Sequence, residues 1–334
     1  MADFFIHGQK ALEVLKRDVQ MNTVRQGYIF EGTDGIGKKT VARKFAAMLF
    51  CTGEAKPCGT CHGCRMFQAN THPDFFVMDE SPVKIDSIRK MNDELFVRPL
   101  ISDRKVFIIE HADEMNTESQ NAFLKSFEEP PSYAVLVLIT SSVHRLLPTI
   151  LSRGTKVSFQ PFSMDKIEKF VSDKYSLAGA RAGFIARYSA GIVGRAMEIC
   201  ENEEILKKRD DILKSLMELS NEKASILPVV EAMGASRRDM PADGDFYFDV
   251  IMSFFRDIAA LKMGGSLINT DYESQITAFA KGIRGASARR CVDIISKTKA
   301  DFCSNIKAKM KYDLWITNML IICWEEIYGT GNRS

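Results

Sequence analysis

Short apolar runs alternate with helical periods along the first 160 residues of the chain. Five runs have the composition of β-strands and cover Gly27–Phe30, Asp74–Met78, Lys105–Ile109, Ala134–Ser141 and Thr155–Phe159. They are almost continuously apolar, as strands are when helices cover both faces of a parallel sheet. Between them, Lys38–Phe50 places its apolar residues on one helical face, and Asn116–Glu128 is a second helical period that Pro130-Pro131 ends. The pattern predicts an α/β domain over residues 1–161.

The β pattern stops after Pro161, and the rest of the chain has helical periods only. Met164–Cys200 predicts a small group of helices that is broken near Gly191 and Gly194. From Glu203 onward the sequence is entirely helical in character.

Apolar stripes in this helical part predict its core. The stripes consist of Ile205, Leu206, Ile212, Leu213, Leu216 and Met217, of Phe254, Phe255, Ile258 and Leu261, and of Leu314, Trp315, Met319, Leu320, Cys323 and Ile327. Stretches that contain Gly or Pro separate the helices at Met233–Asp245 and Gly264–Asn269. We expect a small helical domain over residues 162–204 and an all-α domain over residues 205–334.

Composition and charge narrow the class of protein. The 334 residues are 46% hydrophobic and 26% charged, which is ordinary for a globular chain of two or three domains. A formal net charge of +2 argues against a free-standing, strongly basic nucleic-acid binder. No apolar run approaches the ~18 residues of a membrane helix, and the N-terminus lacks the basic start and apolar core of a signal peptide. We therefore expect a cytoplasmic protein, in which thiols stay reduced.

Four of the eight cysteines are clustered with the spacing C-x6-C-x2-C-x2-C, at Cys51, Cys58, Cys61 and Cys64. Four thiolates form the closed tetrahedral shell of a structural zinc site, which has no open position to activate water. Gly59 and Gly63 supply backbone freedom for the turns, and His62 is a competing ligand. The alternative is a set of free or redox-active thiols. The scattered cysteines, Cys200, Cys291, Cys303 and Cys323, are expected to be small core residues.

A phosphate-binding loop is indicated between the first strand and the helix that follows it. Residues 32–40 read Gly-Thr-Asp-Gly-Ile-Gly-Lys-Lys-Thr, and they contain the G-x-x-x-x-G-K pattern of a P-loop. The candidate phosphate-binding residues are Gly32, Gly35, Gly37, Lys38, Lys39 and Thr40. Lys39 stands where a Ser or Thr hydroxyl would bind Mg²⁺, and Thr40 is rotated ~100° around the helix from that position. ATP is thus expected to bind weakly or not at all, with Mg²⁺ doubtful, and the alternative is a glycine turn without nucleotide.

The acidic motif of a P-loop ATPase is degenerate as well. The third strand is followed by Glu110-His111 in place of an Asp for Mg²⁺ and a Glu that orients water. Asp113-Glu114 would lie roughly 10 Å too far along a continuing strand. Two independent defects predict that hydrolysis is very slow or absent.

Further segments resemble the clamp-loader subunits of bacterial DNA polymerase III, a family of AAA+ proteins. The similar segments are Gly8-Gln9, the P-loop, the four-cysteine module, Thr71-His72-Pro73-Asp74, Val83–Arg89, Asn121–Lys125, Glu128–Pro131 and Leu147–Gly154. The resemblance covers about the first 200 residues by motif and the remainder by helical architecture. It implies an AAA+ α/β domain with an inserted zinc knob, a small helical lid and a helical collar that holds a ring of subunits together.

The resemblance also assigns roles to single residues. Arg153 would reach across a subunit interface to a neighbour's ATP as an arginine finger, and the alternative is a surface salt bridge. Gly154 stands where the family usually has Cys, a change expected to matter little. Thr140 or Ser141 would be the polar γ-phosphate sensor, or a strand-end hydroxyl bonded to local backbone. Arg195 comes one place later than the family's second sensor.

The implied function is a non-hydrolysing structural member of a replicative clamp loader. Its partners would be gamma/tau- and delta-type subunits and, through the assembly, the sliding clamp and primed DNA. It would be a component of a DNA polymerase holoenzyme without ATPase activity of its own. The alternatives are an ATP-hydrolysing motor subunit of gamma/tau type and a zinc-containing adaptor that binds neither ATP nor clamp.

Overall fold

The computed structural model describes residues 10–177, 179–232, 244–304 and 312–329. Gly8-Gln9, most of the Met233–Asp245 stretch and the side chain of Cys303 therefore lie outside the described residues. The chain divides into two compact units. The first comprises Met1–Ser163 with Ala190–Arg195, and the second comprises Met164–Ser189 with Ala196–Ser334. The three-domain division expected from the sequence stays a prediction.

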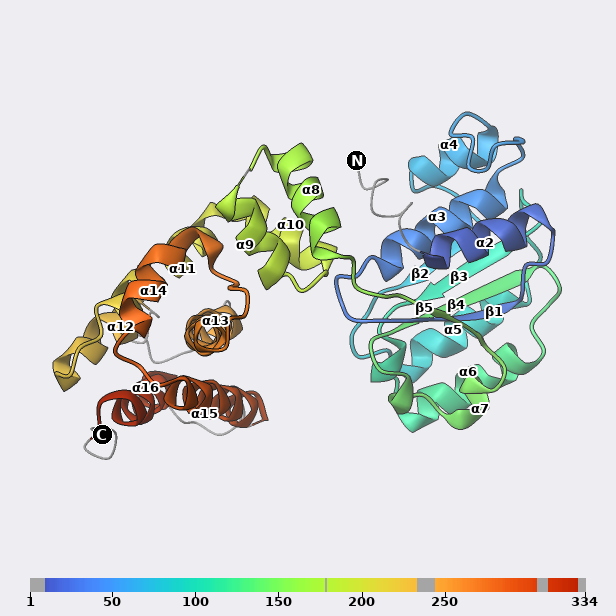
Figure 1. Ribbon diagram of the computed structural model, residues 1–334. Coiled ribbons are helices and arrows are strands. Elements are labelled where there is room, and N and C mark those ends of the chain that lie inside the picture. The colour runs from blue at the N-terminus through green and yellow to red at the C-terminus, as the bar shows by residue number, and fades with distance from the viewer. Residues whose placement is uncertain (1–9, 178, 233–243, 305–311, 330–334) are drawn as a thin grey trace. The chain divides into compact units, whose positions relative to one another are not determined.

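A five-stranded parallel sheet forms the centre of the first unit (Figure 1). Its strands are β1 (Gly27–Glu31), β2 (Phe75–Met78), β3 (Lys105–Ile109), β4 (Ala134–Thr140) and β5 (Thr155–Ser158). They are ordered β2-β3-β4-β1-β5, and every neighbouring pair is parallel. The five strands predicted from the apolar runs are confirmed, each within one residue at either end. Glu31 pairs with Thr140, so β1 and β4 end side by side where the polar motifs follow.

Helices cover both faces of this sheet (Figure 1). On one face α2 (Lys10–Gln20) and α3 (Lys38–Phe50) pack against alternate strand residues such as Tyr28 and Phe30. On the other face lie α5 (Ile85–Leu95), α6 (Thr117–Glu128) and α7 (Pro148–Leu151), in the core that contains Ile29. A short helix, α4 (His62–Gln68), and two 3-10 turns, η1 (Ala112–Glu114) and η2 (Val143–Arg145), complete the unit. The alternation of Tyr28, Ile29 and Phe30 between faces explains why the strand is apolar throughout.

The second unit is helical over its described residues. Its helices are α8 (Met164–Tyr175), α9 (Ala180–Tyr188), α10 (Val193–Glu201, which begins in the first unit), α11 (Glu203–Met217), α12 (Ile226–Ala232), α13 (Gly244–Lys262), α14 (Glu273–Ala280), α15 (Gly285–Ser304) and α16 (Tyr312–Tyr328), with the 3-10 turns η3 (Lys223–Ser225) and η4 (Thr270–Tyr272). The predicted stripes on α11, α13 and α16 enter the cores, except Leu314, whose residue is 57% exposed. Cys291 and Cys323 are buried as expected.

A buried arginine connects α11 to other segments of the second unit. Arg209 of α11 is 1% exposed, and its guanidinium lies 3.5 Å from the ring centroid of Phe184 on α9. It donates hydrogen bonds of 2.7 Å to both carboxylate oxygens of Asp271 and one of 2.9 Å to Asn269. The charge is thus neutralised within the core, as a buried guanidinium requires.

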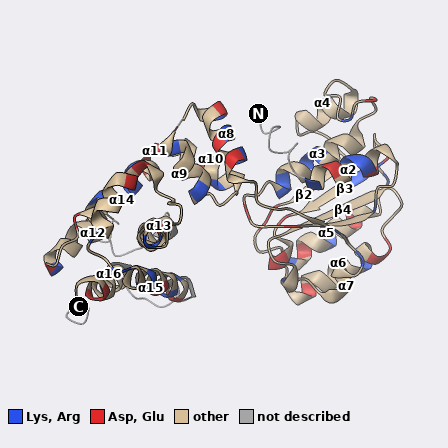
Figure 2. Ribbon diagram, viewed as in Figure 1, with Lys and Arg blue, Asp and Glu red and all other residues tan. Residues whose placement is uncertain are grey.

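Charged residues of both signs are interspersed along the helices (Figure 2). Among the residues that the structure describes, no helix is both long and apolar enough to cross a lipid bilayer.

Candidate functional site

The P-loop connects β1 to α3 by a tight backbone path. Gly35 and Gly37 adopt positive φ angles of 77° and 102°, which only glycine adopts without strain. A Cβ on Gly32 would lie 2.9 Å from Cβ of Phe159. The glycine spacing recognised in the sequence is thus required by the geometry of the loop.

Lys38 is buried and bonds to the P-loop itself. Its Nζ donates to the carbonyl oxygen of Gly32 and, over 3.0 Å, to Oδ1 of Asp34. Asp34 is exposed, so solvent reaches this carboxylate. A role of Lys38 in binding terminal phosphates stays a prediction.

Lys39, the departure from the P-loop pattern, forms an ion pair with Glu110. Glu110 directly follows β3, is buried, and donates its backbone N–H to the carbonyl oxygen of Met78 over 2.8 Å. The two positions that a Mg²⁺-dependent P-loop uses for a hydroxyl and a carboxylate are therefore occupied here by an ammonium and its counter-charge. Thr40 is exposed. This donor set does not fit Mg²⁺, and no metal-dependent step follows from it.

The chain reverses direction immediately after Glu110. His111 has a left-handed φ of 52° and leads into η1, which returns the chain toward the end of β4. Asp113 Oδ2 thereby accepts a hydrogen bond of 2.8 Å from Ser141 Oγ. The expectation that Asp113 lies far beyond the strand end is wrong, because it assumed a chain that continues straight.

Thr140 and Ser141, the sensor candidates, both lie at this strand end. Thr140 is buried, and its Oγ1 accepts the backbone N–H of Ser142 over 3.0 Å. Burial opposes ionisation of Asp113, but hydrogen bonds from Ser141 and Thr140 outweigh it and lower the pKa of this carboxyl. The structure brings Asp113 into this cluster, although the distance along a continuing strand had argued against it.

The start of α10 lies against the P-loop. The backbone N–H of Gly194 donates to the carbonyl oxygen of Gly35 over 2.9 Å, and a Cβ on Gly35 would lie 3.8 Å from the backbone nitrogen of Arg195. The structure thus places the second sensor candidate, Arg195, beside the P-loop. Whether its side chain meets nucleotide stays a prediction.

Arg153 lies at the surface, in the turn between α7 and β5. Its guanidinium donates to the carbonyl oxygen of Thr149 over 3.0 Å and forms an ion pair of 3.0 Å with Glu128 at the end of α6. Both side chains of the pair are 42% exposed. The guanidinium is thus held at the surface by groups that solvent also reaches.

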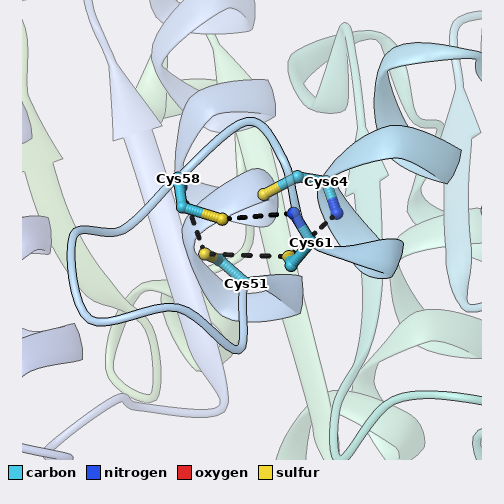
Figure 3. Close-up of side chains that lie close together, drawn as sticks. All are labelled: Cys51, Cys58, Cys61 and Cys64. Carbon is cyan, nitrogen blue, oxygen red and sulfur yellow. Dashed lines mark hydrogen bonds between the residues drawn. The ribbon is translucent and has the colours of Figure 1, made fainter.

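The four clustered cysteines converge between α3 and α4 (Figure 3). Their Sγ atoms all lie within 4.8 Å of one another, and those of Cys51 and Cys61 are 4.0 Å apart. Zn–S bonds of ~2.3 Å in a tetrahedron place sulfurs about 3.8 Å apart, so the four thiols fit one zinc ion with small adjustments. Among the described residues the group contains cysteines alone, and His62 is not part of it.

Backbone amides donate hydrogen bonds to three of these sulfurs. The N–H groups of Cys58, Cys61 and Cys64 donate to the preceding cysteine sulfurs over 3.2, 3.3 and 3.4 Å. Backbone hydrogen bonds from Thr60 and Cys61 lower the pKa of Cys58 to about 7, and those from Cys64 and Thr52 lower the pKa of Cys61 to about 5. Desolvation raises the pKa of Cys64 to about 12. Because thiolates are the metal-binding form, two of the four positions favour it without any ion.

The two glycines of the module act differently. Gly59 has a positive φ of 74°, as the predicted turn requires. Gly63 lies in α4, where a Cβ would come within 2.3 Å of the carbonyl oxygen of Phe50. Gly63 therefore permits α4 to approach the end of α3, a steric reason that differs from the predicted backbone freedom.

Comparison with known proteins extends these observations. Residues 7–163 match the family described as "DNA polymerase III, delta subunit". DNA polymerase III subunit delta' of Bacillus subtilis is 26% identical over 305 residues, which are 90% of this chain and 92% of that protein. The chain is thus similar to delta-prime-type subunits of DNA polymerase III, and residues 7–163 carry the family match.

Two further relatives are similar over part of the chain. Subunit delta' of Pseudomonas aeruginosa is 41% identical over 132 residues, 38% of this chain and 40% of that protein. DNA polymerase III subunit gamma of Buchnera aphidicola is 30% identical over 211 residues, 59% of this chain and 57% of that protein. Of these three relatives, the B. subtilis protein is the one that matches the chain over most of its length.

Proposed function

We propose that this chain is a delta-prime-type, non-hydrolysing member of the clamp-loader ring and supplies Arg153 to the ATP site of a neighbouring subunit. Its partners would be gamma/tau- and delta-type subunits, and through the assembly it would act on the sliding clamp and primed DNA. The proposal rests on one contrast. The chain's own P-loop carries an ammonium where Mg²⁺ would bind, whereas Arg153 is presented at the surface.

The contacts of Arg153 suit transfer to another anion. A half-exposed pair such as Arg153–Glu128 contributes little to stability, because water screens both charges. A guanidinium can form two parallel hydrogen bonds with a phosphate, and the polyanion offers more charge than one carboxylate. Glu128 would hold the side chain near its working position until a neighbour's phosphate displaces it.

The test uses a loader reconstituted from this chain with gamma/tau and delta subunits. Arg153→Ala should slow ATP turnover at the contacted site by on the order of 10³-fold, the value of an arginine finger. Arg145→Ala is the matched control, because it removes another exposed arginine, which lies in η2 of the same unit. Assembly should be unchanged in both variants by size-exclusion chromatography. Turnover that is the same with Arg153→Ala as with Arg145→Ala would refute the arginine-finger role.

The isolated chain tests the motor alternative, which the similarity to gamma keeps open. The proposal expects no ATP turnover by the purified chain above that of a Lys38→Ala variant. Turnover that disappears on Lys38→Ala would make this chain a motor subunit. Failure to bind the other loader subunits would favour the zinc-containing adaptor.

A further inference from the structure

The ion pair between Lys39 and Glu110 lies where two distant parts of the chain meet. Lys39 is in the first turn of α3, the helix that follows β1, whereas Glu110 directly follows β3. In the sheet, β4 lies between β1 and β3. The carboxylate is buried, with its side chain 10% exposed, whereas the lysine side chain is 55% exposed. A buried carboxylate needs a cation close to it, and Lys39 forms an ion pair with it here.

The position of this cation is informative. In P-loop proteins that use a divalent ion, the ion lies between the residue after the P-loop lysine and a carboxylate at the end of a neighbouring strand. Lys39 and Glu110 are the residues at these two places. An ammonium has three donors and no acceptor, so it neutralises a carboxylate but cannot ligate a metal.

We propose that Lys39 Nζ replaces the divalent cation of this P-loop, so that the site is closed to Mg²⁺ and takes nucleotide phosphates only as free anions. The lysine positive charge joins α3 to the end of β3, the connection that a bound ion makes elsewhere. This inference rests on the proposed function, because it explains why the chain holds the P-loop fold without hydrolysis.

Equilibrium binding of ATP to the isolated chain tests the proposal, with Mg²⁺ present or with EDTA. The wild-type chain should bind ATP with the same affinity in both. A wild-type chain that binds no nucleotide in either condition would contradict the proposed binding of phosphates as free anions. Lys39→Thr returns the hydroxyl and frees Glu110, so Mg²⁺ should tighten its ATP binding by about tenfold or more. Mn²⁺, followed by its paramagnetic relaxation, should bind with ATP to the variant and not to the wild type.

Lys39→Arg is the matched control, because it keeps the charge and should stay insensitive to Mg²⁺. If Lys39→Thr does not fold, Lys39→Gln removes the charge with a side chain of similar length and takes its place. Tighter ATP binding by the wild-type chain in Mg²⁺ would overturn the proposal, as would a folded variant without any Mg²⁺ response. These binding measurements use the isolated chain without partner subunits. Their result therefore does not depend on whether Arg153→Ala slows ATP turnover in the assembled loader.

Discussion

Gly194 shows how closely two backbones approach beside the P-loop. A Cβ at this position would lie 2.8 Å from the carbonyl oxygen and 2.9 Å from Cα of Gly35, and backbone atoms cannot move aside as a side-chain end can. Gly194→Ala should therefore destabilise the first unit by about 1–3 kcal/mol. Urea unfolding followed by circular dichroism measures this. Gly282→Ala, where nothing lies within 4 Å of the new Cβ, is the control and should change the free energy of unfolding little.

Asp113 gives the folded chain a dependence on pH. Its pKa is lower in the folded chain than in the unfolded one, since hydrogen bonds from Ser141 and Thr140 outweigh the effect of burial. The stabilisation is complete above the unfolded-state pKa and is lost as the pH falls through the folded-state value. Asp113→Asn should cost about 1 kcal/mol at pH 7 and much less at acid pH. An equal loss in urea unfolding at both pH values would contradict this.

Single residues show the limits of reading the sequence. The residue types of Lys39 and Glu110 indicated a defective metal site. Their ion pair could be predicted only with knowledge of the order of the strands in the sheet. Gly154 was expected to replace Cys without consequence. In the structure a Cβ there would lie 2.4 Å from Cδ1 of Ile29 and 3.2 Å from Phe127, so a side chain would require repacking of this core.

At the scale of elements, a bound zinc ion would stabilise the fold of the four-cysteine module. Zinc would join the end of α3 to α4, a helix of seven residues that is too short to be stable alone. The purified chain should contain one zinc ion, and Cys64→Ser should lose it together with the helical signal of α4. Metal analysis by mass spectrometry measures the content. Cys200→Ser is the control, and equal zinc in both variants would contradict the assignment.

The strands were predictable because their signal is local. Each is a short, almost continuously apolar run, and burial on both faces of the sheet produces that pattern directly. The return of the chain at η1 was not predictable, because it depends on the left-handed conformation of His111, which residues other than glycine adopt only uncommonly. That one conformation moved Asp113 into the cluster at the end of β4.

At the scale of the whole molecule, two compact units should respond separately to damage. Arg209→Met removes the partner of Asp271 in the second unit and leaves that carboxylate without its buried counter-charge. The expected loss is about 3–5 kcal/mol of the stability of the second unit. Lys207→Met, on an exposed position of the same helix, should cost little.

The zinc content tests whether the two units unfold independently. Arg209→Met should keep its zinc when the second unit has unfolded in moderate urea, because the cysteine module belongs to the first unit. Simultaneous loss of zinc and of the α11 helical signal would show that the two units unfold as one.

The alternation of runs along the chain predicted the class of the first unit and the helical nature of the second. It did not predict the burial of Arg209, because an arginine is rarely buried unless it is paired, and its partners lie elsewhere in the chain. Its burial depends on Phe184, Asn269 and Asp271, which come from other segments. Contacts of this kind are visible only after the helices are packed.

The short segment Ala190–Arg195 has a practical consequence for dividing the protein. It belongs to the first unit although it follows α8 and α9, which belong to the second. A fragment that ends at Ser163 would lack the Gly194–Gly35 hydrogen bond and the carbonyl oxygen of Gly191 that accepts the N–H of Phe162. One proteolytic cut therefore cannot release an intact first unit. To express this unit alone, a linker after Ser163 should replace residues 164–189 and connect directly to residues 190–195.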